Sequence, residues 1–197
     1  FEVGFLSNVI SLNVDFFKEN RDNILMQPQT VPAWVQVDFK DLNIGKTNNH
    51  GYEIELGFNQ RSKTGLHYYI KSNFSFSENR VVYADDPESM PNYQRTEGKP
   101  IGVHNGYMLV PGFFNSVDDI NNYIIPAGAT NIVEGDLKYI DYNADGKIDQ
   151  NDNAPIGFST YPIYNYGATI GFDYKNISFY ALFQGSKGKS SYFNRLA

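Results

Sequence analysis

The segments Tyr52-Glu-Ile-Glu-Leu-Gly-Phe-Asn59 and Leu66-His-Tyr-Tyr-Ile-Lys-Ser-Asn-Phe-Ser-Phe-Ser77 decide the fold of this chain. In both segments apolar side chains recur at every second position, with polar or small residues between most of them. A period of two places alternate side chains on opposite faces of a β-strand. The connection between them, residues 60–64, is polar and short enough for a turn. The two segments therefore predict a β-hairpin with long arms.

The same alternation occurs in four other stretches of the chain. These stretches are residues 1–5, 9–19, 164–174 and 177–184. Short turns at residues 6–8 and at Lys175-Asn176 separate the members of each pair. We therefore predict an all-β protein built from antiparallel strands at about 1–19, 52–77 and 163–184.

The connections between the predicted strands alternate between short and long. Residues 20–50, 78–162 and the stretch from 185 onward are long, and a short strand is expected inside the first of them, at 35–39. In an antiparallel sheet, this alternation places every short turn on one rim and every long loop on the other.

Strand length and the character of the two faces point to a membrane protein. The predicted strands match the roughly 9–11 residues with which a tilted strand crosses a bilayer. One face is apolar and aromatic, whereas the other carries Asp15, Glu53, Glu55 and Lys71. Outer-membrane β-barrels combine a lipid-facing apolar side, a polar lumen, short turns and long external loops. We therefore expect a transmembrane β-barrel with extracellular loops at about 20–50 and 78–162.

A second interpretation of the same pattern stays open. Strands of a soluble β-sandwich also alternate between polar and apolar residues, so the chain could be a secreted, calcium-stabilised β-sandwich that binds carbohydrate. Six predicted strands are too few for a barrel, since the smallest bacterial barrels have about eight. The barrel interpretation therefore requires that the chain, which begins at Phe1 without an initiator Met, is a piece of a longer protein.

Composition narrows the classes of function. The net charge is −6 and the basic residues are scattered, so we expect no nucleic-acid partner. The absence of cysteine excludes disulfides, zinc thiolates and a thiol nucleophile. Tyr and Phe number 15 each against one Trp, and such a content of Tyr suits a boundary between apolar and wet surroundings.

The residues Asp141-Tyr-Asn-Ala-Asp-Gly-Lys-Ile-Asp-Gln-Asn-Asp152 have the spacing of a calcium-binding loop. Oxygen-bearing side chains stand at positions 1, 3, 5, 9 and 12, and a glycine that permits a sharp turn stands at position 6. The predicted ligands are Asp141, Asn143, Asp145, the backbone carbonyl of Lys147, Asp149 and Asp152. The final Asp replaces the usual Glu and resembles the dockerin variant, although a dockerin has two such loops. The alternative is an Asx-rich turn without metal.

Several short motifs in the second half of the chain occur in a recognisable order. They are Glu97-Gly-Lys-Pro-Ile-Gly-Val-His-Asn-Gly-Tyr107, Gly112-Phe-Phe-Asn-Ser116, Gly135-Asp-Leu-Lys-Tyr139, the calcium loop, Pro155-Ile-Gly157 and Phe183-Gln-Gly185. This run resembles the C-terminal half of the SusC/RagA-type TonB-linked outer-membrane proteins of Bacteroidetes. The preceding strands resemble that family more weakly.

The resemblance implies a fold and a set of partners. It implies a 22-stranded barrel, of the plugged type known among outer-membrane transporters, in the outer membrane of a Gram-negative cell. It also implies a SusD-like surface lipoprotein as lid, a TonB complex that acts through an N-terminal part absent from this chain, and import of glycans or peptides. An enzyme is not expected.

Individual residues allow weaker predictions. Aromatic residues of the predicted loops could stack on sugar rings, with local packing as the alternative. These residues are Trp34, Tyr93, Tyr107, Phe113 and Phe114. The three histidines, His50, His67 and His104, lack metal-ligand spacing, so we expect no zinc site. Glu53 and Glu55 are expected to be lumen-facing charges and not a catalytic pair.

Overall fold

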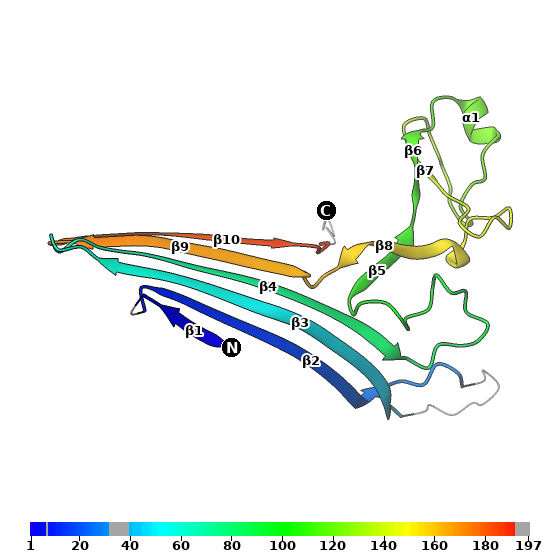
Figure 1. Ribbon diagram of the computed structural model, residues 1–197. Helices are drawn as coiled ribbons and strands as arrows, with labels where there is room; N and C mark the ends of the chain where they lie inside the picture. The colour runs from blue at the N-terminus through cyan, green and yellow to red at the C-terminus, as the bar shows by residue number, and fades with distance from the viewer. Residues whose placement is uncertain (7, 32–39, 192–197) are drawn as a thin grey trace. The chain divides into compact units, whose positions relative to one another are not determined.

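The structure of the chain is a computed structural model that describes residues 1–6, 8–31 and 40–191. The chain divides into two compact units. Unit 1 consists of Phe1–Pro87, Thr96–Gly102 and Ser159–Ala197, and unit 2 consists of Glu88–Arg95 and Val103–Phe158. Unit 1 contains one antiparallel sheet of six strands in the order β1-β2-β3-β4-β9-β10. Figure 1 shows these six strands side by side in a single layer.

The six strands confirm the antiparallel β prediction. Their bounds are β1 Glu2–Phe5, β2 Ile10–Met26, β3 Leu42–Arg61, β4 His67–Tyr83, β9 Tyr164–Tyr174 and β10 Ile177–Lys187. β3 and β4 form the predicted hairpin. They pair in continuous register from Thr47 opposite Val81 to Arg61 opposite His67, and the one irregularity lies just beyond this range, between Lys46 and Thr47. The two-residue turn at Lys175-Asn176 joins β9 to β10, with Lys175 in the left-handed region at φ 54°.

Four strands extend beyond the predicted bounds, which corrects both long connections. Residues 20–26 belong to β2, residues 42–50 to β3, residues 78–83 to β4 and residues 185–187 to β10, so the connections shorten to residues 27–41 and 84–163. The extensions of β2 and β3 carry polar residues on both faces and lose the period-two signal, yet their backbones still pair, for example Asn20 with Asn48. The short strand predicted at 35–39 and the ring of Trp34 lie outside the described residues.

The strand β4 pairs directly with β9, across the whole of the predicted excursion. The register runs from His67 opposite Asp173 to Phe76 opposite Tyr164. The residues between these strands therefore leave the sheet and return to its next position. Most of them build unit 2.

Unit 2 contains short elements that the sequence did not predict. They are β5 Val103–Tyr107, β6 Leu109–Phe113, the helix α1 Val117–Asn121, β7 Leu137–Tyr139, the 3₁₀ helix η1 Gln150–Asp152 and β8 Asn153–Ser159. β5 pairs with β8 and β6 with β7, which gives two small sheets. Ser116 caps α1 by accepting a hydrogen bond from the backbone N–H of Asp119.

The buried side chains of this unit gather around its small sheets. Phe114, Ile148 and Ala154 are almost fully buried. Phe114 packs edge-on against Tyr123, and the Lys138 ammonium lies 5.2 Å from the Phe114 ring centre while it forms an ion pair with Asp119 at 2.6 Å. The Lys138 hydrogen bond holds the pKa of the Asp119 carboxyl below its usual value. Unit 2 therefore has a small core of its own.

Candidate functional site

The acidic loop predicted to bind calcium joins β7 to β8 in unit 2. Its last residue, Asp152, is fully buried at the end of η1. One carboxylate oxygen of Asp152 accepts hydrogen bonds from the backbone N–H groups of Tyr142 (2.7 Å) and Asn143 (3.3 Å), and the other accepts one from Asp149 (2.7 Å). A single side chain thereby ties the two ends of the loop together.

Burial and hydrogen bonding shift the pKa of the Asp152 carboxyl in opposite directions. Burial by itself raises the pKa of the Asp152 carboxyl, because it penalises the charged form. The N–H groups of Asp149, Asn143 and Tyr142 favour the charged form, and together they leave the pKa below its usual value. The buried group is therefore a carboxylate at neutral pH.

The first half of the loop folds into a series of Asx turns. Asp141 accepts a hydrogen bond from the backbone N–H of Gly146 at 2.8 Å, and Asp145 accepts one from Lys147 at 2.9 Å. Gly146 has φ +85°, a conformation that residues with a Cβ seldom adopt. The glycine at position 6 is thus required by the turn itself.

Metal binding does not follow from this geometry alone. In the described part of the chain, no group of three or more His, Asp or Glu side chains is arranged to hold a metal ion. The Asn143 amide donates to Asp145 at 3.0 Å, so side chains that would share an ion contact each other instead. Calcium therefore stays a prediction from the spacing of the ligands.

The loop aromatics proposed as sugar contacts occupy different surroundings. Tyr93 lies against the Tyr142 ring, with ring centres 4.8 Å apart, and its hydroxyl donates to the Asn151 carbonyl. Tyr107 packs against Tyr139. Phe113 is half exposed, whereas Phe114 is buried in the core of unit 2. Of these four, Phe113 is the most open to a ligand.

The buried position of Phe114 predicts a structural effect on substitution. Phe114→Ala should destabilise unit 2 by about 3–5 kcal/mol, because it removes a buried aromatic ring and leaves a cavity. The neighbouring change Phe113→Ala is the matched control and should cost under about 1 kcal/mol. Hydrogen exchange of residues 103–158 in the full-length protein would measure both. Equal losses of protection in the two variants would contradict this assignment.

Two of the histidines make contacts that their spacing in the sequence did not reveal. His67 lies between Asp173 and Asn59, at 2.8 Å from an oxygen of each. His50 lies 4.0 Å from Glu78. Because β4 and β9 are far apart in sequence, only their pairing brings His67 and Asp173 together.

The apolar face of the six-stranded sheet is the largest continuous feature of unit 1. Phe16, Tyr52, Phe76 and Tyr164 pair directly across β2, β3, β4 and β9 and form one row of rings. Ring centres in this row are 5.4–6.3 Å apart. A second row, towards the short turns, consists of Phe58, Tyr68, Phe172 and Phe179.

Apart from Ser72, the side chains between the two rows are apolar or aromatic, and several are exposed. Ile170 is 47% exposed, Leu56 48% and Phe183 60%. The buried apolar side chains of the described residues are Ala84, Phe114, Ile148 and Ala154, and none of these belongs to the six-stranded sheet. A soluble sandwich would cover this face with a second sheet, so the exposure of the face disfavours that alternative. The helix α1 is too short to cross a membrane, and no other described helix is long and apolar enough to do so.

No family model matches the chain. Two curated proteins of Formosa agariphila do match it: TonB-dependent receptor P26, 24% identical over 98% of this chain, and TonB-dependent receptor P39, 24% identical over 97%. The chain is similar to TonB-dependent receptors over almost its whole length. It spans 21% of the length of each of these two receptors.

Solved structures agree with this similarity at the level of the fold. The chain resembles a chain of the RagAB peptide importer in its open-open state, with a TM-score of 0.64, and in its closed-closed state, with a TM-score of 0.63. In both comparisons the identity is 17%, and the match covers 95% of this chain and 20% of the other. The six-stranded sheet therefore has the fold of a segment of such a receptor.

Proposed function

We propose that this chain forms part of the wall of a TonB-dependent importer in the outer membrane, which takes up glycans or peptides. The observation that carries the proposal is the apolar face between two aromatic rows, with the polar face behind it. Lipid would cover the apolar face, and the polar face would line the lumen. The function is transport, and the polar-face carboxylates Glu53 and Glu55 act as lumen charges.

The distance between the aromatic rows supports a membrane-spanning band. Tyr68 and Phe76 belong to the two rows and are eight residues apart on β4. At a rise of about 3.4 Å per residue, they are separated by about 27 Å along the strand. A strand tilt of about 40° reduces this to about 21 Å along the membrane normal, close to the apolar band of about 25 Å in outer-membrane barrels.

The whole receptor would close this sheet into a barrel. Within the described residues, β1 and β10 are the two edge strands, each with one hydrogen-bonded neighbour. Unpaired strand edges are unfavourable, and barrels remove them by closure. Other segments of a longer protein would supply the neighbouring strands, up to the 22 strands and the plug that the family resemblance implies.

The proposed partners follow from the rim of the sheet at which the long connections lie. The connection 27–41 and the excursion 84–163 leave the sheet at the rim opposite the short turns, and we propose that this rim is extracellular. A SusD-like surface lipoprotein would close over it. The TonB complex would act through the N-terminal part of the receptor, beyond the segment that this chain spans.

Calcium binding is part of the proposal. Asp141, Asn143, Asp145, the Lys147 carbonyl, Asp149 and Asp152 supply the oxygen ligands that Ca²⁺ prefers. A bound ion would stiffen the loop, so that less entropy is lost when the extracellular rim closes on a ligand or a lid.

Removal of calcium should therefore loosen the loop. We expect EDTA to increase protease cleavage of the full-length receptor within residues 130–160, and added Ca²⁺ but not Mg²⁺ to restore protection, because Mg²⁺ demands a smaller and stricter octahedral site. Cleavage sites in the turn at 60–64 serve as an internal control. A cleavage pattern unchanged by EDTA would rule out the structural role of calcium.

Fractionation of the source cells tests the proposed location and size. An antibody raised against residues 97–160 should detect a band far larger than 22.4 kDa in the outer-membrane fraction. Deletion of the gene should then abolish growth on one class of polymeric nutrient and leave growth on its monomer intact. A band near 22.4 kDa in a soluble or secreted fraction would contradict the proposal.

A further inference from the structure

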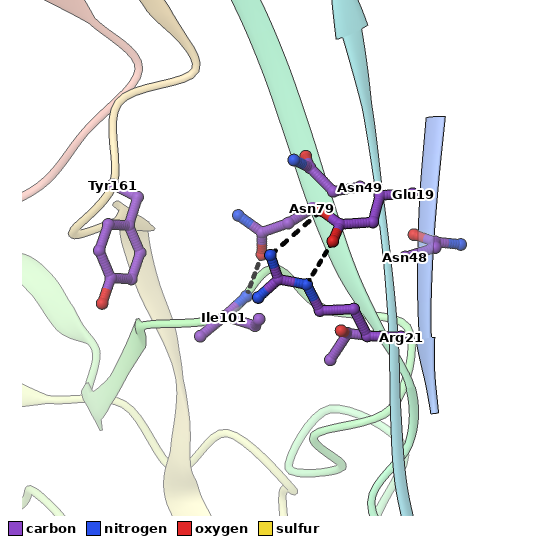
Figure 2. A pocket seen from close by; sticks show the side chains of 8 residues that line it. Glu19, Arg21, Asn48, Asn49, Asn79, Ile101 and Tyr161 are labelled. Atoms are coloured by element: carbon purple, nitrogen blue, oxygen red, sulfur yellow. Dashed lines mark hydrogen bonds and ion pairs between the residues drawn. The ribbon is translucent and has the colours of Figure 1, made fainter. Parts of the chain in front are cut away.

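A pocket of about 260 Å³ opens on the polar face of unit 1, on the side of the first aromatic row away from the short turns. Its walls come from β2, β3 and β4, together with Ile101 and Tyr161 (Figure 2). Glu19, Asn49 and Asn79 stand on neighbouring strands in direct register, so their side chains share this face. Asn48 points to the other side of β3, as alternation along a strand requires.

Two carboxamides present hydrogen-bond donors to the pocket. The side-chain oxygen of Asn79 accepts a hydrogen bond from the backbone N–H of Ile101 at 2.7 Å. The side-chain oxygen of Asn49 accepts one from the Ser77 hydroxyl at 3.0 Å. Both oxygens are thus engaged within the protein, which orients each amide and leaves its NH₂ group for a ligand.

The charged groups of the pocket neutralise each other. Arg21 binds Glu19 through two parallel hydrogen bonds, from Nε to Oε1 at 2.7 Å and from Nη2 to Oε2 at 3.2 Å. Figure 2 shows this pair in the pocket wall. A carboxylate held in this way retains lone pairs that can accept hydroxyl protons, and the guanidinium retains N–H donors. The pocket therefore offers donors and acceptors but no net charge.

An aromatic ring forms the opposite wall. Tyr161 is 59% exposed, and in Figure 2 its ring stands across the pocket from Asn79 and Arg21. The Ser159 hydroxyl accepts a hydrogen bond from the Tyr161 backbone N–H at 3.0 Å and donates one to the Ile101 carbonyl at 2.6 Å. These bonds fix the segment that carries the ring beside the segment that carries Ile101.

We propose that this pocket is a subsite for one uncharged, hydroxylated ring of the transported oligomer, that is, a neutral sugar unit. The planar amides and the Glu19–Arg21 pair match neighbouring hydroxyl groups, and the Tyr161 ring matches the apolar face of a pyranose. The volume lies below the roughly 300–1,000 Å³ of sites that enclose a whole small molecule, so a single unit fits. This inference rests on the proposed import function.

Binding to the purified full-length receptor tests the subsite. The probes are maltohexaose, laminarihexaose and xylohexaose, a hexamer of galacturonic acid, and a tryptic digest of casein, each titrated by calorimetry. At least one neutral hexasaccharide should bind the wild type. Tyr161→Ala and Asn49→Ala should each weaken that binding about 10- to 100-fold, the range for loss of one well-placed contact. Lys18→Gln, on the opposite face of β2 beside Glu19, should leave it unchanged.

Glu19→Gln supplies the test of charge. It leaves Arg21 unpaired, so binding of the galacturonic acid hexamer should gain at least about tenfold relative to the neutral hexasaccharide. The inference is overturned if no neutral hexasaccharide binds, or if the Tyr161→Ala and Asn49→Ala variants bind it as tightly as the wild type does. It is also overturned if these two variants lose binding of the casein peptides instead of the hexasaccharide. Failure of the import function itself would appear separately, as uptake of no oligomer by cells that carry the wild-type receptor.

Discussion

Leu56→Arg should lower the free energy of unfolding of the receptor in a bilayer by about 2–4 kcal/mol, the cost of a lipid-facing arginine near the membrane midplane. Leu56 lies on the apolar face at the level midway between the two aromatic rows, paired with Leu12 on β2 and Ser72 on β4. An arginine there would place its guanidinium in hydrocarbon, where neither water nor a carboxylate can satisfy its donors.

The matched control is the same residue type on the other face. Asn73 is exposed on the polar side of β4, opposite Glu55. Asn73→Arg should change the unfolding free energy by less than about 1 kcal/mol, since the new charge meets water and a carboxylate. The measurement is the urea midpoint of the receptor refolded into phosphatidylcholine vesicles, followed by its gel mobility. Equal effects of the two arginines would show that the apolar face does not contact lipid.

Asp152→Ala should destabilise unit 2 about as strongly as the loss of the Phe114 ring. It removes both oxygens that accept the N–H groups of Tyr142, Asn143 and Asp149 in a fully buried position. A buried donor left without a partner costs about 1–3 kcal/mol, so the loss should reach about 3–5 kcal/mol for the loop as a whole. Hydrogen exchange of residues 141–152 should accelerate by at least about a hundredfold.

Two comparisons separate the hydrogen-bonding role of Asp152 from its proposed role as a calcium ligand. Asn151→Ala is the control, because the exposed Asn151 forms its hydrogen bonds with Tyr93, Gln94 and Asp149 through its backbone, so its side chain can be removed without breaking them. The Asp152→Ala defect should persist in EDTA and become larger in calcium. A defect that disappears in EDTA would assign Asp152 to the metal alone.

The sequence predicted the parts of the sheet in which one face is apolar and the other is polar. There the difference between the two faces imposes a period of two, as in Ile54, Leu56 and Phe58, and both the strands and their short turns follow. The same signal fails where both faces are polar, as at Asn20 and Asn48, because backbone pairing continues without any pattern in the side chains. The ends of β2 and β3 were therefore not predictable from periodicity.

The pocket on the polar face escaped prediction for a different reason. Glu19, Asn49, Asn79 and Tyr161 come from four separate segments, and only the strand register brings the first three together. The acidic loop was predictable because its residues act within one short segment. The turn at Gly146 follows from the loop's own residues, but the burial of Asp152 depends on the rest of unit 2.

The pairing of β4 with β9 also bears on how the chain folds. These strands meet across an excursion of about 80 residues, whereas β3 and β4 are joined by a five-residue turn. Because closure entropy grows with the logarithm of loop length, the longer closure costs about 2.5 kcal/mol more if the excursion is a random coil. An excursion that collapses early around Phe114 and Ile148 would bring its ends together and reduce that barrier. Unit 2 would then set the rate at which this part of the sheet assembles, before it serves any role in transport.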